Sequence, residues 1–179
     1  MAQGRGIATV SPWTAERVGK RCPLSSISSG VLKAALAVWN QKHGRRRFPL
    51  KSEMPPRSMR GFLRHLTLFS ISQDVVDFRH RVMGDAAVVA WGASFQGLGR
   101  KDLNRIQDGM GDVFTKLFSA IVREQCPLLM RGALWEGEVD EVAQEVLFLP
   151  LSSDGTRIDF VLSVGSYEKR VLGGPEGKP

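Results

Sequence analysis

The sequence has few of the features that mark secreted, metal-binding or membrane-spanning proteins. It contains only two cysteines, Cys22 and Cys126, among 179 residues, too few for a disulfide framework or a zinc cluster. Its richest apolar run, residues 82–91, is interrupted by Gly84 and Asp85 and is much shorter than the roughly 20 residues of a transmembrane helix. The N-terminal residues also lack the apolar core of a signal peptide, and we therefore expect a cytoplasmic protein.

Motifs of the common enzyme classes are missing as well. The sequence has no Gly-x-Ser-x-Gly nucleophile elbow, no glycine-rich phosphate loop ending in Lys-Ser or Lys-Thr, and no His-Glu-x-x-His helix. The pair Gly97 and Gly99 lacks the third glycine and the preceding strand of a dinucleotide site. The acidic run at residues 136–141 is more typical of a solvated turn than of a pair of catalytic carboxylates. We expect that the protein is not an enzyme.

Positive charge is concentrated in the first third of the chain. Residues 1–60 hold 12 Lys and Arg against 2 Asp and Glu, whereas residues 61–179 hold 13 against 16. Aromatic residues do not alternate with these basic groups as they would in a platform for stacked bases. We do not expect a nucleic-acid partner, but an adaptor that binds nucleic acid through the basic third stays an alternative. The run Arg45, Arg46, Arg47 is a solvated charge run, a set of ion pairs with acidic turns, or a patch for an acidic partner.

The apolar pattern predicts one α+β domain between two tails. Ser28 or Ser29 can cap a helix whose apolar stripe packs either on its own sheet or on a second subunit. The predicted segments are a flexible tail at 1–26, an N-terminal helix and proline-rich connector at 27–63, a core at 64–168 and a flexible tail at 169–179.

Between residues 31 and 167, segments whose apolar residues have helical spacing alternate with segments whose apolar residues have strand spacing. The expected helices are 31–43, 58–63, 86–91, 101–106 and 108–125, and the expected strands are 65–72, 76–83, 128–136, 142–151 and 158–167. A five-stranded antiparallel sheet with the helices segregated to one face accounts for all of them.

This order of elements, with several short segments, resembles the PAS domain. The segments are Trp39 followed by His43-Gly44-Arg45-Arg46-Arg47-Phe48-Pro49, then Leu66-Thr67-Leu68-Phe69, Phe78-Arg79-His80-Arg81-Val82-Met83-Gly84, Gly97-Leu98, and Phe148-Leu149-Pro150-Leu151-Ser152-Ser153-Asp154-Gly155. Between residues 31 and 167 the chain is similar to small single-domain bacterial PAS proteins of the alphaproteobacterial type. The resemblance implies a PAS-like sheet of order 2-1-5-4-3, helices on one face, an extra N-terminal helix, and a pocket between helices and sheet.

The resemblance implies no fixed ligand, because PAS domains hold haem, flavin, small carboxylates, lipids or nothing. The helix at 108–125 has no histidine for haem, the stretch at 91–94 has no flavin-type cysteine, and the cofactor is left open. The three histidines lie on different elements, so we expect no metal site, and His80 is expected to be a hydrogen-bonded core or pocket residue. The long-helix stripe is either plain core or part of the pocket. The candidate pocket residues are Phe78, His80, Val82, Trp91, Phe95, Met110, Phe114 and Phe118.

We expect a non-catalytic sensory or protein-docking PAS domain that acts in trans in signal transduction, since no kinase, cyclase or DNA-binding effector is recognisable in the chain. A small-molecule sensor with a ligand between the long helix and the sheet is the first alternative. The resemblance implies pairing with a signalling protein such as a histidine kinase or another PAS domain, and we expect a homodimer through the N-terminal helix. The candidate partner surface comprises Leu32, Leu36, Trp39, Arg45, Arg46 and Arg47.

Overall fold

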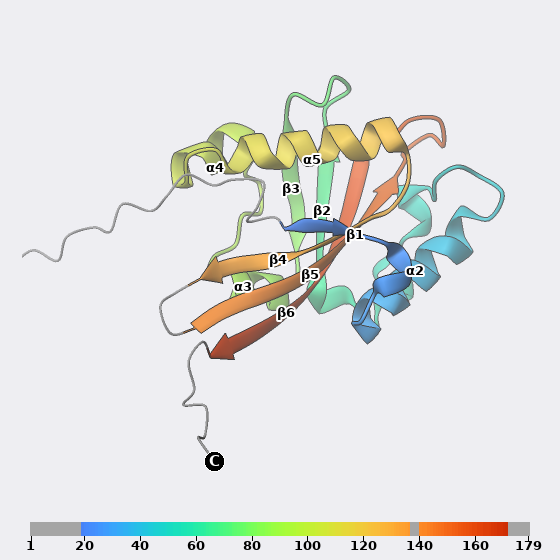
Figure 1. Ribbon diagram of the computed structural model, residues 1–179. Coiled ribbons are helices and arrows are strands. Elements are labelled where there is room, and N and C mark those ends of the chain that lie inside the picture. Colours follow the sequence, from blue (N-terminus) through green and yellow to red (C-terminus); the bar gives the residue numbers. More distant parts are fainter. Residues whose placement is uncertain (1–18, 137–139, 172–179) are drawn as a thin grey trace, which may run out of the picture.

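The computed structural model describes residues 19–136 and 140–171 (Figure 1). Residues 1–18 and 172–179, which belong to the two predicted tails, lie outside the described residues. The strands are β1 (Lys20–Cys22), β2 (Leu66–Ile71), β3 (Phe78–Met83), β4 (Leu128–Glu136), β5 (Asp140–Leu151) and β6 (Phe160–Val171). The helices are α2 (Gly30–His43), α3 (Asp85–Trp91), α4 (Arg100–Ile106) and α5 (Met110–Glu124), with short 3₁₀ turns at Leu24–Ser26, Lys51–Glu53, Pro56–Met59 and Leu63–His65.

The strands form one antiparallel sheet in the order β1-β4-β5-β6-β2-β3. Counted from β2 as the first strand, the five long strands have the order 2-1-5-4-3, which confirms the prediction. The sixth strand, β1, corrects it, because Lys20–Cys22 pair with β4 although they were assigned to a flexible tail. At the other end, β6 continues to Val171, beyond the predicted start of the second tail.

The sheet is covered on both faces. Figure 1 shows α5 lying across the strands, whereas α2 lies on another side of the sheet. The first core contains Phe69, Phe114, Phe118, Ile121, Val146 and Phe148, from α5 and the facing side of the sheet. The second core contains Leu32, Ala35, Trp39, Leu147, Leu149 and Leu162, from α2 and the opposite side. The helices α3, α4 and α5 therefore share one face as predicted, and the extra N-terminal helix covers the other.

The apolar stripe of α2 packs on the protein's own sheet. Leu32 and Trp39 are buried, and the indole N–H of Trp39 donates a 2.8 Å hydrogen bond to the carbonyl oxygen of Pro150. Leu36 is partly buried against the same core. The prediction that this stripe forms a dimer surface is wrong for Leu32 and Trp39, because their side chains are already used inside the fold. Among the described residues, every helix is too short or too polar to span a bilayer.

The N-terminus of α2 is held by a carboxylate from β5. Glu145 accepts hydrogen bonds from the backbone N–H of Ser28 (3.1 Å) and of Ser29 (2.9 Å), and Arg131 on β4 donates to it from Nε (3.0 Å) and Nη2 (2.6 Å). Burial raises the pKa of Glu145, but these hydrogen bonds outweigh burial and hold the pKa below its usual value. Ser29 is the N-cap residue, within the predicted pair, yet its hydroxyl caps no N–H group among the described residues. A distant carboxylate supplies the cap instead.

The substitution Glu145→Ala should lower the free energy of unfolding by about 2 to 3 kcal/mol, because it removes the acceptor for the backbone N–H groups of Ser28 and Ser29, just before α2, and leaves Arg131 without its carboxylate. Urea unfolding at neutral pH measures the change. The matched control is Glu168→Ala, at an exposed position of β6, which should change stability by less than about 0.5 kcal/mol. Equal effects of the two substitutions would contradict the structural role of Glu145.

Candidate functional site

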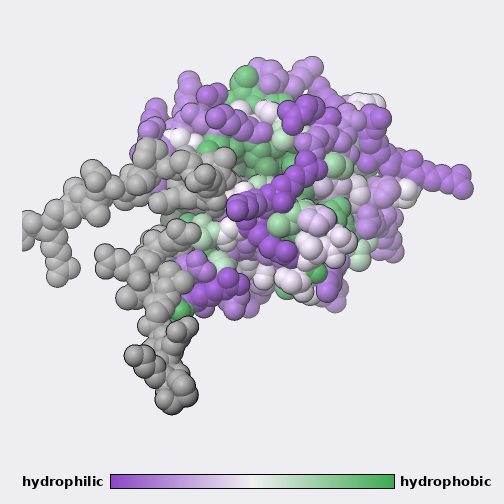
Figure 2. Space-filling view, viewed as in Figure 1, coloured by the Kyte–Doolittle hydropathy of each residue, from purple (hydrophilic) through white to green (hydrophobic). Residues whose placement is uncertain are grey.

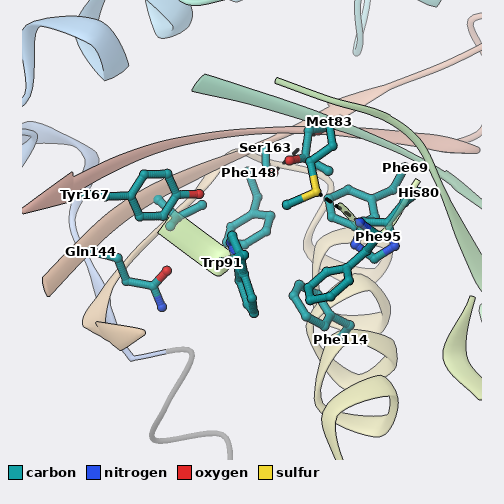
Figure 3. Close-up of a pocket in the computed structure, with 12 residues that line it drawn as sticks. Phe69, His80, Met83, Trp91, Phe95, Phe114, Gln144, Phe148, Ser163 and Tyr167 are labelled. Atoms are coloured by element: carbon teal, nitrogen blue, oxygen red, sulfur yellow. Dashed lines mark hydrogen bonds between the residues drawn. The ribbon is translucent and has the colours of Figure 1, made fainter. Parts of the chain in front are cut away.

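A small pocket lies between the sheet and the helices α3 and α5 (Figure 3). Its open volume is about 30 Å³, close to the share of one molecule in liquid water. Aromatic rings occupy most of the space, and Figure 3 shows Trp91 between the side of Tyr167 and Gln144 and the side of Phe95 and Phe114. The lining residues are Thr67, Phe69, His80, Met83, Trp91, Phe95, Phe114, Gln144, Val146, Phe148, Ser163 and Tyr167.

The structure brings together only part of the predicted pocket. The predicted residues that line it are His80, Trp91, Phe95 and Phe114. Phe78 of β3 and Met110 and Phe118 of α5 are instead buried in the core around the pocket. For the two residues of α5, the simpler interpretation of the helical stripe as core agrees with the structure. The rings of Phe78 and Phe118 still support the lining, since their centroids lie 5.8 Å and 5.9 Å from that of Phe114.

A β-bulge turns Val82 away from the pocket, although the sequence predicted that it lines the pocket. Strict alternation along the strand put His80 and Val82 on one side. In the structure Phe69 pairs with His80 and Leu68 pairs with Val82, so Arg81 is an extra residue in β3. A bulge of this kind reverses the alternation beyond it, and Val82 is 44% exposed on the face that carries α2. The alternating sequence gives no signal of the extra residue.

His80 is the buried titratable group of the pocket. It is 3% exposed, and its Nδ1 lies 3.1 Å from the carbonyl oxygen of Leu98. Since a carbonyl only accepts, Nδ1 carries the proton of the neutral ring. Burial lowers the pKa of His80 to about 4. His80 is thus a hydrogen-bonded pocket residue, as expected, and the described part of the chain contains no cluster of three metal-ligating side chains.

A second polar group enters the pocket from β6. The ring of Tyr167 folds back over Gly165, where a Cβ atom would lie 2.3 Å from the hydroxyl oxygen. The hydroxyl forms a hydrogen bond with Trp91, and burial raises the pKa of Tyr167 to about 12. The sequence analysis missed this residue, although the only tyrosine of the chain follows a glycine two positions earlier on the same strand face.

The three arginines at residues 45–47 do not all have the same role. Arg46 forms an ion pair with Glu53 and donates a 3.0 Å hydrogen bond to the carbonyl oxygen of Lys42. This is a structural ion pair, but its acid lies in the connector rather than in the acidic turns. Arg45 and Arg47 are exposed, and their role in binding a partner stays a prediction.

We expect Gly165→Ala to lower the free energy of unfolding by about 1 to 3 kcal/mol, because the added methyl group forces the Tyr167 ring off the strand. In the background of Tyr167→Ser the same substitution should cost much less, since the colliding ring is gone. Chemical unfolding of the four proteins in this double-mutant cycle measures the coupling. Independent effects of the two substitutions would show that the ring does not lie over Gly165.

The low pKa of His80 predicts a loss of stability on mild acidification. The unfolded chain binds a proton near the ordinary pKa of 6.5, whereas the folded chain binds it only near pH 4. The free energy of unfolding should therefore fall by up to about 3 kcal/mol as the pH drops across this window. Urea unfolding at several pH values checks this; His80→Gln should remove the slope above pH ~4.5, and His43→Gln should keep it. A slope that survives in His80→Gln would assign the effect to another group.

The sheet order, the long helix across the sheet and the pocket beneath it agree with one family of domains. A family model described as the PAS domain matches residues 27–164. Comparisons with curated proteins and with solved structures give no match. The matched range includes α2, the strands β2 to β5, the first part of β6 and the lining of the pocket up to Ser163. The chain therefore belongs to the PAS domain family, whose members are domains of the sensory or signalling type.

Proposed function

We propose that this protein is a non-catalytic regulatory domain that acts by docking on a partner protein in signal transduction. The observation that supports this most is the filled pocket. Its open volume is about 30 Å³, whereas sites for small molecules commonly measure roughly 300 to 1,000 Å³. With the interior occupied by side chains, the surface is the part of the molecule that is free to carry a signal.

The chemistry of the pocket also favours a role other than catalysis. Among its lining residues there is no carboxylate, lysine, arginine or cysteine. General acid–base catalysis needs a group that exchanges protons near the working pH, and burial keeps His80 neutral there while keeping Tyr167 protonated. A pocket of this composition can position polar atoms but has no group ready to transfer a proton.

The partner we propose is a signalling protein such as a histidine kinase or another PAS domain. A second copy of this chain is a further candidate. Because the stripe of α2 is buried, a homodimer has to use another surface than the one predicted from the sequence. We do not extend the proposal to nucleic acid, because aromatic residues do not alternate with the basic groups as they would in a platform for stacked bases.

A small-molecule sensor is the second candidate function, and one observation favours it. Polar side chains gather at a cavity that a plain core would line with apolar groups: Thr67, His80, Gln144, Ser163 and Tyr167. Such groups could orient a small polar ligand if the aromatic rings moved aside. This candidate requires a wider pocket than the one described.

Native mass spectrometry of the intact, gently purified protein separates the two candidates. Docking through the surface predicts a spectrum in which every species has the mass of the polypeptide or a whole multiple of it. Retained additional mass would contradict a filled pocket and support the sensor. In that case Ser163→Leu, which extends an apolar side chain into the cavity, should abolish the additional mass, whereas Val89→Leu on the exposed side of α3 should preserve it.

A further inference from the structure

An apolar groove lies on the face of the sheet that carries α2, at the side of β2 and β3. Its floor comes from the strands and its wall from the turns at Lys51–Glu53, Pro56–Met59 and Leu63–His65. The cavity measures about 100 Å³, of the same order as the ~150 Å³ apolar cavities that take up a benzene ring. It therefore has room for about one bulky aliphatic side chain. The residues of the floor are Leu66, Leu68, Val82, Leu151 and Leu162.

The groove is open to solvent. Val82 is 44% exposed on its floor and Leu63 is 39% exposed on its wall. The helix α2 packs over β5 and β6, while only short 3₁₀ turns with two consecutive prolines, Pro55 and Pro56, reach the half of this face formed by β2. Leu66, Leu151 and Leu162 form the buried bottom of the groove, at 1–2% exposed, so its accessible apolar lining comes mainly from Val82 and Leu63 at the rim.

Basic residues are concentrated in the segment that forms the wall of this groove. Residues 45–64 contain seven Lys and Arg and a single acid, Glu53. Lys51 lines the groove, and Arg81, next to Val82 on β3, donates a 2.8 Å hydrogen bond from Nε to the hydroxyl oxygen of Ser70. Arg57 and Arg60 are exposed on the wall segment, and within the described residues none of these four cations has an acidic partner. The charge of the rim is complementary to an acidic ligand.

The edge strand limits how a partner can approach. At β3 the backbone N–H of His80 already donates a hydrogen bond to the carbonyl oxygen of Leu98 (3.0 Å), and its carbonyl oxygen accepts one from the N–H of Gly97 (2.8 Å). An added strand therefore finds part of the sheet edge occupied, whereas a helix needs only the groove and contributes side chains at its i, i+3 and i+4 positions. The concave shape also suits an inserted side chain better than a lipid surface, which takes up protruding apolar groups.

We propose that the groove binds an acidic amphipathic helix of a partner protein, whose aliphatic side chain enters between Leu68, Val82 and Met59. Aspartate or glutamate residues on either side of that anchor pair with the basic rim. This inference rests on the proposed docking function and adds the surface and the chemistry of the partner.

The protein's own helices do not fit this description. The helix α2 contains no acidic residue. The acids of the other described helices are already paired with basic side chains: Asp85 with Arg64, Asp102 with Arg105, Asp112 with Arg100 and Glu124 with Arg21. A second copy of the chain therefore presents no free acidic helix among the described residues.

Fluorescence anisotropy with a labelled helical peptide of about 15 residues, with leucines at i, i+3 and i+4 and glutamates elsewhere, tests the proposal. Saturable binding is expected. It should weaken about tenfold or more for Val82→Glu, which places a charge on the groove floor, and for the double variant Arg57→Glu, Arg60→Glu. The matched controls are Val89→Glu, at a position that is 80% exposed on α3, and Arg157→Glu; both should bind as the wild type does.

Four further measurements test the chemistry of the groove and distinguish the competing occupants. Binding should weaken between about 0.1 M and about 1 M salt, where the Debye length falls from about 10 Å to about 3 Å, and a peptide with serine in place of leucine should not bind. Binding to vesicles of phosphatidylcholine and phosphatidylserine without binding to the peptide would overturn the proposal in favour of a membrane. A dimer in sedimentation that Val82→Glu dissociates would overturn it in favour of a second copy.

Absence of peptide binding, or equal binding by Val82→Glu, would also overturn the groove as the site. The proposed docking function has its own test, because it depends on the masses that native mass spectrometry detects and not on binding of this peptide. Peptide binding that persists in Val82→Glu together with an unmodified mass would retain docking and move it to another surface.

Discussion

Alternate residues of β5 belong to two different cores, and this division determines where each covering element can lie. Val146 and Phe148 pack under α5, while Leu147 and Leu149 pack under α2. A strand that is buried on both faces has to be apolar at nearly every position, and residues 146–151 of β5 are uncharged throughout. With β5 and β6 in the middle of the sheet, both helices have to cross these two strands.

One polar residue of the same strand orients this arrangement. Glu145 precedes the apolar run and accepts hydrogen bonds from the backbone N–H groups of Ser28 and Ser29, just before α2, and from the guanidinium of Arg131. The contact fixes the start of α2 over the β4 side of the sheet, and the helix then covers β5 and β6. The β2 side of the same face is left to the short turns of the connector. The uncovered groove and the position of α2 thus have a common cause. The side of the molecule seen in Figure 2 is mainly hydrophilic, with smaller hydrophobic patches among charged side chains, as expected where most apolar surface is buried in the two cores.

The sequence predicts those elements whose own periodicity is sufficient to define them. The strand Leu128–Glu136 has the predicted bounds. The helix α5 follows the predicted stripe and ends at Glu124, before Gln125, which has a left-handed conformation. The strand β1 has only three residues and no pattern of its own, so its pairing with β4 depends on a partner that periodicity does not reveal. The face taken by α2 could not be predicted either, because an apolar stripe fits its own sheet and a second subunit equally well.

The same limit explains the outcome for the pocket. The resemblance to the PAS domain points to Phe114 and Trp91, whereas helical spacing alone also selects Met110 and Phe118, which belong to the core. The position of Val82 could not be predicted, since the bulge at Arg81 depends on how β2 and β3 pair rather than on either sequence. Gln144 and Tyr167 come from strands whose register sets which side chains meet, and a pattern of period two carries no information on register between strands.

The pocket and the groove lie on opposite sides of the same two strands. Thr67 and Phe69 of β2 line the pocket, while Leu66 and Leu68, between and beside them, form the floor of the groove. In β3 the bulge separates His80 on the pocket side from Val82 on the groove side. A shift of β2 and β3 that makes room inside the pocket has to displace the floor of the groove as well, because close-packed strands move as units. The two candidate functions therefore share a mechanical element: a ligand that widened the pocket would act on the surface through β2 and β3, and a partner in the groove would act on the pocket through the same strands.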